Sequence, residues 1–349
     1  MRPQQIFDVL VIGGGLAGSA ASFHLASHGY SVAIVEREAQ AHHKICGEFL
    51  SQETLPYLKE LGIDLDALKA SSLNAFSFYS THFNSRNLFD APARGLSRYV
   101  LDEACLEKAG QAGCLIFRGE QAESYEKDSS QTFLLKTSRG ILKAKTLFLA
   151  TGKHELKKMN IRQGLESSAI GFKMHCHLTE EAQKKLKQDI ALFFFKGGYG
   201  GLCKIENQIA NFCFIIDKKR FRNLENSYET TLSSLQKENP SLGEFLKNAS
   251  PLWPKVLAMS GIPYGYLFRA KVSTQETGIY PLGDQFAVIP SLTGSGMAIA
   301  LYTARKAFTR LARPLHIIIK IKMRESLLMQ TNASKPSNPA CTWLIPFMP

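Results

Sequence analysis

The sequence of 349 residues predicts a mixed α/β fold in which a parallel-sheet domain is interleaved with an antiparallel-sheet domain. Three observations predict this fold. A glycine-rich turn joins a strand to a helix at the N-terminus, a second glycine-rich turn opens a helix near Met297, and β-type alternation lies between them. The length exceeds that of one ordinary core, so two domains are expected.

The first forty residues predict a strand, a helix and a second strand in close succession. Residues 7–12 (FDVLVI) are apolar and β-branched over the length of a strand, and residues 16–27 have helical character. Gly29 follows where a helix would stop. Residues 31–35 (SVAIV) predict the second strand, which ends in Glu36.

The turn after the first strand, residues 13–18 (GGGLAG), is typical of a Rossmann-type dinucleotide site. Gly13 permits the tight turn, Gly15 lets the backbone approach a pyrophosphate at the helix N-terminus, and Gly18 lets the helix pack closely on the sheet. Glu36 stands where its carboxylate can accept hydrogen bonds from both hydroxyls of an adenosine ribose and would repel a 2′-phosphate. On this motif alone the nucleotide is either NAD or FAD.

Two later segments favour FAD. Residues 144–152 (AKTLFLATG) predict a buried strand and a turn, and residues 279–283 predict a short strand that delivers Asp284. An aspartate there can accept a hydrogen bond from a ribityl hydroxyl, which NAD does not have. The glycine-rich residues 293–296 then open an alanine-rich helix, whose N-terminus stabilises negative charge on a pyrophosphate or a flavin ring.

From about Asp8 to about Leu311 the chain resembles the FAD-dependent oxidoreductases with the para-hydroxybenzoate hydroxylase fold, in the branch that includes the geranylgeranyl reductases. The matching motifs are GGGLAG with Glu36, CGEFLS (46–51), GLSRYVLDEACLEKA (95–109), LATGKHEL (149–156), GFKMH (171–175) and GDQFAVIPSLTGSGMAIAL (283–301). The resemblance implies an α/β fold with α+β insertions. In this fold a Rossmann-type FAD-binding domain is interleaved with an antiparallel-sheet substrate domain.

The expected domains are discontinuous along the chain. The FAD-binding domain is expected at 1–74, 95–155 and 276–313, and the substrate domain at 75–94 and 156–275. Residues 314–349 are expected to form an irregular tail. After Pro314 the helical period is lost, which we interpret as a truncation or a shifted reading frame in about the last 35 residues.

The resemblance also implies candidate site residues. Those for FAD are Gly13, Gly15, Ala17, Gly18, Glu36, Arg37, Gly47, Arg98, Ala122, Gly152, Asp284, Gly294, Ser295 and Gly296. Arg98 resembles the arginine that relatives direct at the cofactor, and the alternative is a surface arginine that caps the helix over residues 99–113. Cys46 is the catalytic candidate, because a cysteine of the matching loop faces the flavin ring in reductase relatives. The alternative is a small buried thiol.

The middle region resembles the sheet that covers the substrate face of the flavin. Residues 193–195, 202–206 and 209–216 predict strands, with a hairpin turn at 206–208. The glycines of residues 196–201 (KGGYGG) form no second nucleotide motif, because β-alternation follows them. NAD(P)H is therefore expected as a transient electron donor, unless another protein supplies the electrons. The aromatic residues suit a small apolar or aromatic substrate, although most aromatic residues belong to a core.

Each polar or charged residue of interest in this region has two interpretations, one as part of the active site and one as a structural or solvent-facing residue. Lys173 and His175 alternate on one strand face and either reach the active site or face solvent. No metal site is expected, because His175 and His177 lack a third ligand. The adjacent histidines 42 and 43 are expected to face solvent, and residues 217–220 (DKKR) predict a surface turn.

The implied chemistry stays divided between two enzymes and a third class of protein. In the favoured one, reduced flavin and O2 hydroxylate an aromatic or lipid-like molecule, as in a monooxygenase. In the second, reduced flavin passes a hydride to an isoprenoid-type double bond. In the third, the protein binds FAD without turnover or transfers electrons. Halogenation is set aside, because the paired tryptophans of flavin halogenases are absent: the chain has only Trp253 and Trp343.

Charge and cysteine content limit the partners and the compartment. The formal net charge is +12, but residues 302–349 contain eight basic residues and one acidic residue, so the excess is concentrated there. No basic stripe with interleaved aromatics accompanies it, so nucleic acid is not an expected partner. Residues 315–323 allow at most a weak peripheral membrane contact. The dispersed cysteines, without a signal peptide or a long apolar run, predict a cytoplasmic protein with reduced thiols.

Overall fold

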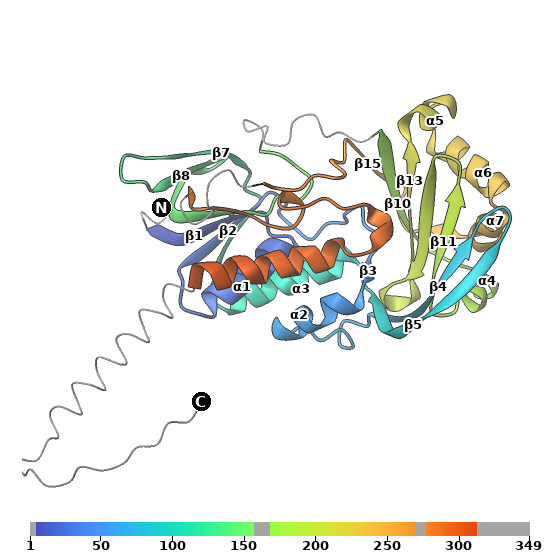
Figure 1. The fold of residues 1–349 in the computed structure, drawn as a ribbon, viewed down its shortest axis with the longest axis horizontal. Coiled ribbons are helices and arrows are strands. Elements are labelled where there is room, and N and C mark those ends of the chain that lie inside the picture. The colour runs from blue at the N-terminus through green and yellow to red at the C-terminus, as the bar shows by residue number, and fades with distance from the viewer. Residues whose placement is uncertain (1–4, 157–167, 270–276, 313–349) are drawn as a thin grey trace, which may run out of the picture. The chain divides into compact units, whose positions relative to one another are not determined.

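The predicted βαβ unit at the N-terminus lies in the first of two β-sheets (Figure 1). The computed structural model describes residues 5–156, 168–269 and 277–312. The chain divides into a unit of residues 1–308 and a second unit of residues 309–349. The two sheets and the cavity belong to the first unit. The predicted irregular tail, 314–349, lies outside the described residues.

The first sheet has seven strands in the order β6-β2-β1-β9-β8-β7, with β16 beside β9. They are β1 (Ile6–Ile12), β2 (Val32–Glu36), β6 (Leu115–Arg118), β7 (Ala122–Lys127), β8 (Phe133–Thr137), β9 (Gly140–Leu149) and β16 (Ile279–Pro281). β1 pairs parallel with β2 and β9, β2 with β6, and β9 with β16. The carboxyl ends of these strands therefore share one edge, where ligands of parallel sheets bind.

Two helices, α1 (Leu16–Ala26) and α3 (Arg98–Gln111), pack together beside this sheet (Figure 1). Small residues fill α1, so most of its length is buried. The side chain of Ser97 accepts a hydrogen bond from the backbone N–H of Val100 and begins α3. The short helix α2 (Leu55–Glu60) lies between the first two strands of the second sheet in the chain, and the last of the described helices begins at residue 296.

The second sheet has nine strands that pair mostly antiparallel. They are β3 (Phe49–Leu50), β4 (Ser71–Tyr79), β5 (Asn84–Gly95), β10 (Ala169–His177), β11 (Asp189–Phe195), β12 (Gly198–Lys204), β13 (Ala210–Asp217), β14 (Ser250–Pro251) and β15 (Leu257–Ser260). β4 and β11 pair parallel. Because β3, β4 and β5 precede α3 in the chain, the two sheets are interleaved in sequence as predicted. The domain boundaries themselves stay a prediction.

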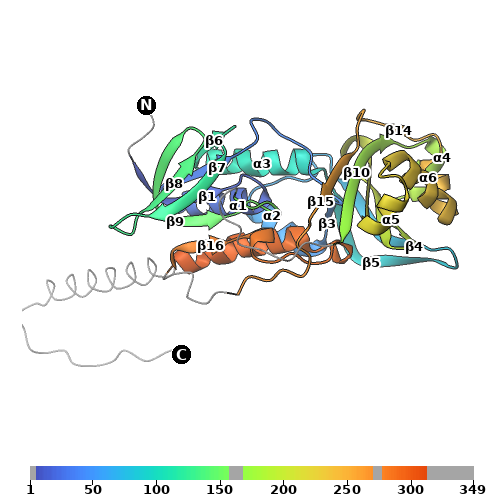
Figure 2. The ribbon, with the colours of Figure 1, turned by 90° about the horizontal axis from the view of Figure 1, so that it is seen from above.

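Helices cover one face of the second sheet (Figure 2). They are α4 (Glu180–Leu186), α5 (Lys218–Asn223), α6 (Tyr228–Glu238) and α7 (Pro240–Leu246). The core beneath them includes Phe172, Phe214 and Phe245. Alternate residues of the sheet strands point to the opposite face. Among them, Leu192 of β11 and Cys213 of β13 line the pocket described below.

Two connections of the second sheet test the sequence interpretation. Residues 206–208 connect β12 to β13 as predicted, in a short 3-10 turn with Asn207 at φ 55°. The predicted surface turn at residues 217–220 is wrong, because α5 begins there. The carboxylate of Asp217 accepts hydrogen bonds from the backbone N–H groups of Lys219 and Arg220 and so caps this helix.

Within the ranges that the structure describes, none of the helices combines the length and the apolar character needed to cross a membrane. The cysteines of these ranges are all free thiols, as the sequence predicted: Cys46, Cys105, Cys114, Cys176, Cys203 and Cys213.

Candidate functional site

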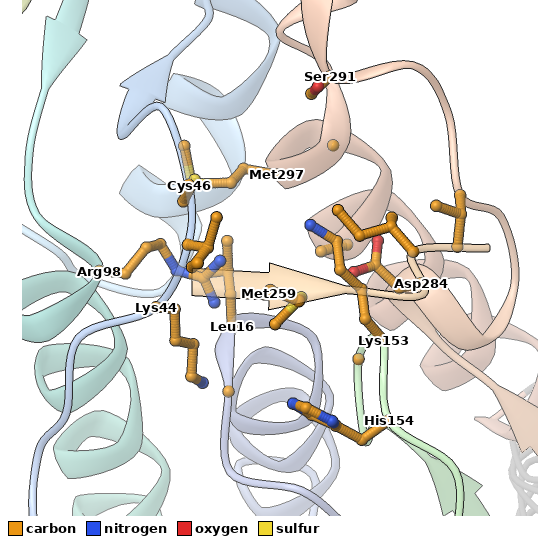
Figure 3. Close-up of a pocket in the computed structure, with 18 of the residues that line it drawn as sticks. Leu16, Lys44, Cys46, Arg98, Lys153, His154, Met259, Asp284, Ser291 and Met297 are labelled. Carbon is orange, nitrogen blue, oxygen red and sulfur yellow. The ribbon is translucent and has the colours of Figure 1, made fainter. Parts of the chain in front are cut away.

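A cavity of about 530 Å³ runs along the carboxyl edge of the first sheet and reaches the open face of the second (Figure 3). This volume is typical of cofactor and ligand pockets. The predicted site residues that line it are Gly13, Gly15, Ala17, Glu36, Arg37, Cys46, Gly47, Arg98, Ala122, Gly152, Asp284, Gly294 and Gly296. Gly18 and Ser295 are the predicted residues that do not line it.

Gly13 and Gly18 shape the turn before α1. Gly13 has φ 105°, and a Cβ on it would lie 2.4 Å from the carbonyl oxygen of Ala150. A Cβ on Gly18 would lie 2.0 Å from the carbonyl oxygen of Gly13. A larger residue at Gly13 would push the turn away from the backbone that follows β9, and one at Gly18 would push α1 away from the turn, so both glycines act through packing.

Gly15 is the glycine that is open to a ligand, and two cations face it. From a Cβ placed on Gly15, Nζ of Lys44 would lie at 3.0 Å and Nη2 of Arg98 at 3.8 Å. Asp102 pairs with Lys44 at 2.8 Å and with Arg98 at 2.7 and 2.9 Å. Glu36, whose Oε2 accepts a hydrogen bond from the N–H of Gly14, adds a second carboxylate next to the turn, so the two cations are matched by two carboxylates. The cations that face Gly15, the open glycine and the helix N-terminus fit the pyrophosphate of FAD.

The carboxylate of Asp102 is ionised at neutral pH. Burial opposes its charge, but the positive charges of Arg98 and Lys44 outweigh burial and lower its pKa to about 2. Sequence reasoning missed Lys44 and Asp102. The spacing of four residues between Arg98 and Asp102 in one helix was a signal for the pair, whereas Lys44 joins only through the fold.

The structure places Arg98 in the pocket and not at the surface. Its side chain is 16% exposed and points toward the cavity from the start of α3, on the same side as Lys44 (Figure 3). The carboxylate of Asp102 fixes its orientation through two parallel hydrogen bonds.

Glu36 ends β2 beside the glycine turn. Its Oε2 accepts a hydrogen bond from the N–H of Gly14 at 2.6 Å, and its Oε1 accepts one from the N–H of Glu38 at 2.8 Å. Each carboxylate oxygen has a further lone pair, so Glu36 remains able to accept hydrogen bonds from ribose hydroxyls. Arg37 pairs with Glu38 at 2.9 Å.

The far end of the cavity lies between Cys46 and the last helix. Cys46 is half-buried and points into the pocket near Met297, while Asp284 lies on the other side (Figure 3). Gly294 has φ 69°, and a Cβ on it would lie 2.9 Å from the ring of Phe49. Ser295 donates its hydroxyl to the carbonyl of Thr293 at 3.2 Å and does not line the cavity.

A buried ionic cluster lies behind the Cys46 loop, and both alternatives for Lys173 and His175 are wrong, because these residues neither face solvent nor line the cavity. Neither side chain faces solvent: Lys173 is 0% exposed and His175 is 2% exposed. Both donate hydrogen bonds to the carboxylate of Glu48, which is also fully buried. Burial opposes the charge of Glu48, but Lys173 and His175 outweigh it and lower its pKa.

The predicted solvent exposure of His43 is wrong. Its ring is half-buried among the rings of Tyr99, Trp253 and His175, with centroids 4.4 to 5.0 Å away. Burial, followed by the positive charge of Lys173, lowers its pKa to about 4. His43 is therefore neutral near pH 7.

The cluster also supplies metal-type ligands that the sequence pattern did not connect. One ligand atom each from His43, Glu48 and His175 lies within 4.8 Å of the others. A divalent cation there would have to displace the hydrogen bond between His175 and Glu48, and it would face the ammonium of Lys173. The charge balance therefore favours a hydrogen-bonded ionic cluster over a metal site.

In this structure a dinucleotide turn opens onto the face of the second sheet that helices α4 to α7 leave uncovered, and the two sheets are interleaved in sequence. This arrangement is the para-hydroxybenzoate hydroxylase fold of FAD-dependent oxidoreductases. Comparisons with known proteins agree. Residues 7–139 match the family described as "FAD binding domain". The chain is similar to FAD-dependent oxidoreductases, and its match to the FAD-binding domain makes FAD its cofactor.

Individual relatives differ in reported activity. The chain is 26% identical to digeranylgeranylglycerophospholipid reductase 2 of Methanosphaera stadtmanae over 84% of its own length and 75% of that protein. It is 27% identical to protein FixC of Salmonella typhi over 49% of its own length and 43% of that protein. The flavin-dependent brominase Bmp2 has a TM-score of 0.76 at 19% identity, covering 89% of this chain and 80% of that one. At this identity the last likeness shows the fold alone.

Proposed function

We propose that the protein is a flavin monooxygenase-type enzyme that uses NAD(P)H and O2 to hydroxylate a small apolar or aromatic molecule bearing a hydroxyl group. The observation that carries this proposal is a chain of hydroxyls on the wall of an otherwise apolar chamber. When bound, FAD supplies hydride acceptance and oxygen activation. The residues of the chamber then bind and orient the substrate.

The chamber is the part of the cavity beyond Cys46, between the second sheet and the loop before the last helix. Its walls are largely aliphatic and aromatic: Phe49, Phe76, Ile190, Leu192, Leu257, Met259, Ile262, Val288, Leu292 and Met297. Burial of an apolar ring or chain against these side chains is favourable and removes water from the flavin end of the site.

The hydroxyl chain gives the chamber its polarity. The hydroxyl of Tyr199 lies 2.5 Å from Oγ of Ser291, and the hydroxyl of Tyr264 lies 3.0 Å from the same atom. Burial raises the pKa of Tyr199, so its phenol stays neutral and can both donate and accept a hydrogen bond. A phenol or alcohol of the substrate can join this chain and pass a proton along it.

The test is NADPH oxidation by the purified yellow protein, in air and under nitrogen, with and without added phenols. Oxidation in air that a phenol stimulates, with formation of the hydroxylated product, is the expected result. Y199F should lower product formation about tenfold to a hundredfold. Y302F, which removes an exposed hydroxyl of the last helix, is the matched control. Flavin that no nicotinamide reduces would instead place the protein in the electron-transfer or inactive class.

A second candidate is reduction of an isoprenoid-type double bond. One relative that matches over most of both chains is a phospholipid reductase by name, and the Cys46 thiol lies in the cavity where a proton donor to a carbon would be needed. Turnover of an alkene under nitrogen, lost in C46S, would support this reaction in place of hydroxylation. Equal alkene turnover by C46S would remove the thiol from it.

A further inference from the structure

The loop of residues 42–48 is held from the second sheet by three separate strands. Nζ of Lys173 on β10 donates to the carbonyl of Lys44 at 2.9 Å. Nδ2 of Asn211 on β13 donates to the carbonyl of Cys46 at 3.1 Å. Sγ of Cys203 on β12 donates to the carbonyl of Gly47 at 3.4 Å. The loop that lines the cofactor cavity is thus fixed from the substrate side.

Glu48 ends this loop and is its most constrained residue. Its backbone lies in the left-handed region at φ 57°, which a non-glycine residue adopts at a cost. Its Oε1 accepts hydrogen bonds from Lys173 and, at 2.8 Å, from the backbone N–H of Arg98. Its Oε2 accepts from Nε2 of His175 at 2.6 Å, so this nitrogen carries the hydrogen. All four groups meet in a region closed to solvent.

The main chains of Arg98 and Lys44, the two cations at Gly15, are hydrogen-bonded to Glu48 and Lys173 respectively. The backbone N–H of Arg98 donates to Glu48, and the backbone carbonyl of Lys44 accepts from Lys173. Their side chains then extend to the open side of Gly15. A shift of the buried pair would therefore move both phosphate-facing cations together, and Cys46, which lies between Lys44 and Glu48 in the loop, would move with them.

We propose that the buried Lys173–Glu48 pair is a positioning device, which holds Arg98 and Lys44 at the FAD pyrophosphate and Cys46 at the flavin end of the cavity. Neither residue of the pair is offered as a catalytic group. The proposal concerns the cofactor site and does not depend on which reaction the enzyme performs. It also explains why a charged pair is retained in a fully buried place, where its loss on one side would leave an uncompensated charge.

The test measures FAD binding to the apoprotein and the reactivity of Cys46 in the FAD-loaded full chain. K173M should weaken FAD binding by at least about tenfold and speed the reaction of Cys46 with a thiol reagent, with C46S as the blank. E48Q keeps the size of the side chain and an acceptor for Arg98, so it should fold and show a smaller loss. The double variant E48Q/K173M removes both charges and should bind FAD more tightly than K173M.

R86M is the matched control, because it also removes one partner of a buried carboxylate in the second sheet. Arg86 donates two hydrogen bonds to Asp189, and neither residue lines the cavity. R86M should lower the thermal midpoint and keep FAD affinity within about twofold. The proposal is overturned if K173M and E48Q bind FAD like the wild type with unchanged Cys46 reactivity. It is equally overturned if R86M weakens FAD binding as much as K173M does.

Discussion

At the residue scale, the charged groups beside the cavity are paired with groups of opposite charge, which lie on the same helix or on other elements. Asp102 of α3 balances Arg98 and Lys44, and Lys173 of β10 balances Glu48. His43 is the group without such balance: among the described residues, its buried Nδ1 has no hydrogen-bond partner. Because burial and the charge of Lys173 outweigh the attraction of Glu48, protonation of His43 should act against the folded state.

The effect of His43 protonation should be visible in how the stability of the folded protein depends on pH. The folded-state pKa of His43 is about 4, against an ordinary value of 6.5, because burial and then Lys173 oppose its charge. Between these values the unfolded chain binds a proton that the folded chain does not. The free energy of unfolding therefore falls as the pH falls through this window.

H43F keeps the ring among Tyr99 and Trp253 but removes the titration. Its thermal midpoint should decrease less than that of the wild type between about pH 7 and pH 5. H177N, which removes an exposed imidazole, is the control for the loss of a histidine from the chain. An equal decrease in H43F and wild type would show that His43 does not carry this dependence.

Sequence reasoning identifies those candidate residues whose position is determined by their neighbours in the chain. The glycines of the first turn and Glu36 follow from the local backbone of a strand–turn–helix unit. Lys44 and Asp102 are 58 residues apart, and Glu48 and Lys173 are 125 residues apart, so each pair exists only because the fold brings two elements together. No local pattern could have predicted these pairs.

At the scale of elements, the glycines of the turn before α1 have two different roles: two of them allow close packing, and one leaves space for a ligand. Gly13 and Gly18 contact backbone atoms, whereas Gly15 faces only the ends of side chains. The strands and helices of this unit were predicted because their apolar periods are regular. Helix α5 was not, because its beginning depends on one capping carboxylate, that of Asp217, within a short charged run.

Alanine at two positions of this turn should therefore give opposite phenotypes. G15A has an ordinary backbone conformation (φ −74°) and meets only side-chain ends, so the apoprotein should fold with a wild-type thermal midpoint. Its methyl group occupies the approach of the pyrophosphate, and FAD affinity should fall by at least about tenfold. G18A places Cβ against a backbone oxygen and should cost about 1–3 kcal/mol of stability or more.

Calorimetric unfolding of both apoproteins and flavin titration distinguish the two effects. If G15A lost stability as G18A does, the open side of Gly15 would not be a ligand position. If G15A bound FAD like the wild type, the pyrophosphate would lie elsewhere along the cavity.

At the scale of the whole molecule, the cofactor site is built before the chain reaches its basic end. Among the residues that the structure describes, all that line the cavity lie at or before Ala300, while residues 302–349 hold most of the excess positive charge. The cations that face Gly15, Lys44 and Arg98, come from the first third of the chain. The described cations of the candidate pyrophosphate site therefore come from outside the basic end.

Removal of residues 314–349 should leave FAD affinity within about twofold of the full chain, because it deletes no cavity residue and no cation of the pyrophosphate site. Truncation after Thr293 is the matched control. It removes Gly294, Gly296 and the helix that begins at residue 296, and it should abolish stable flavin binding. Flavin titration and cooperative thermal unfolding are measured for both chains. Loss of FAD from the longer truncate would mean that residues 314–349 contribute to the site, and the interpretation of this segment as dispensable for the flavin domain would be wrong.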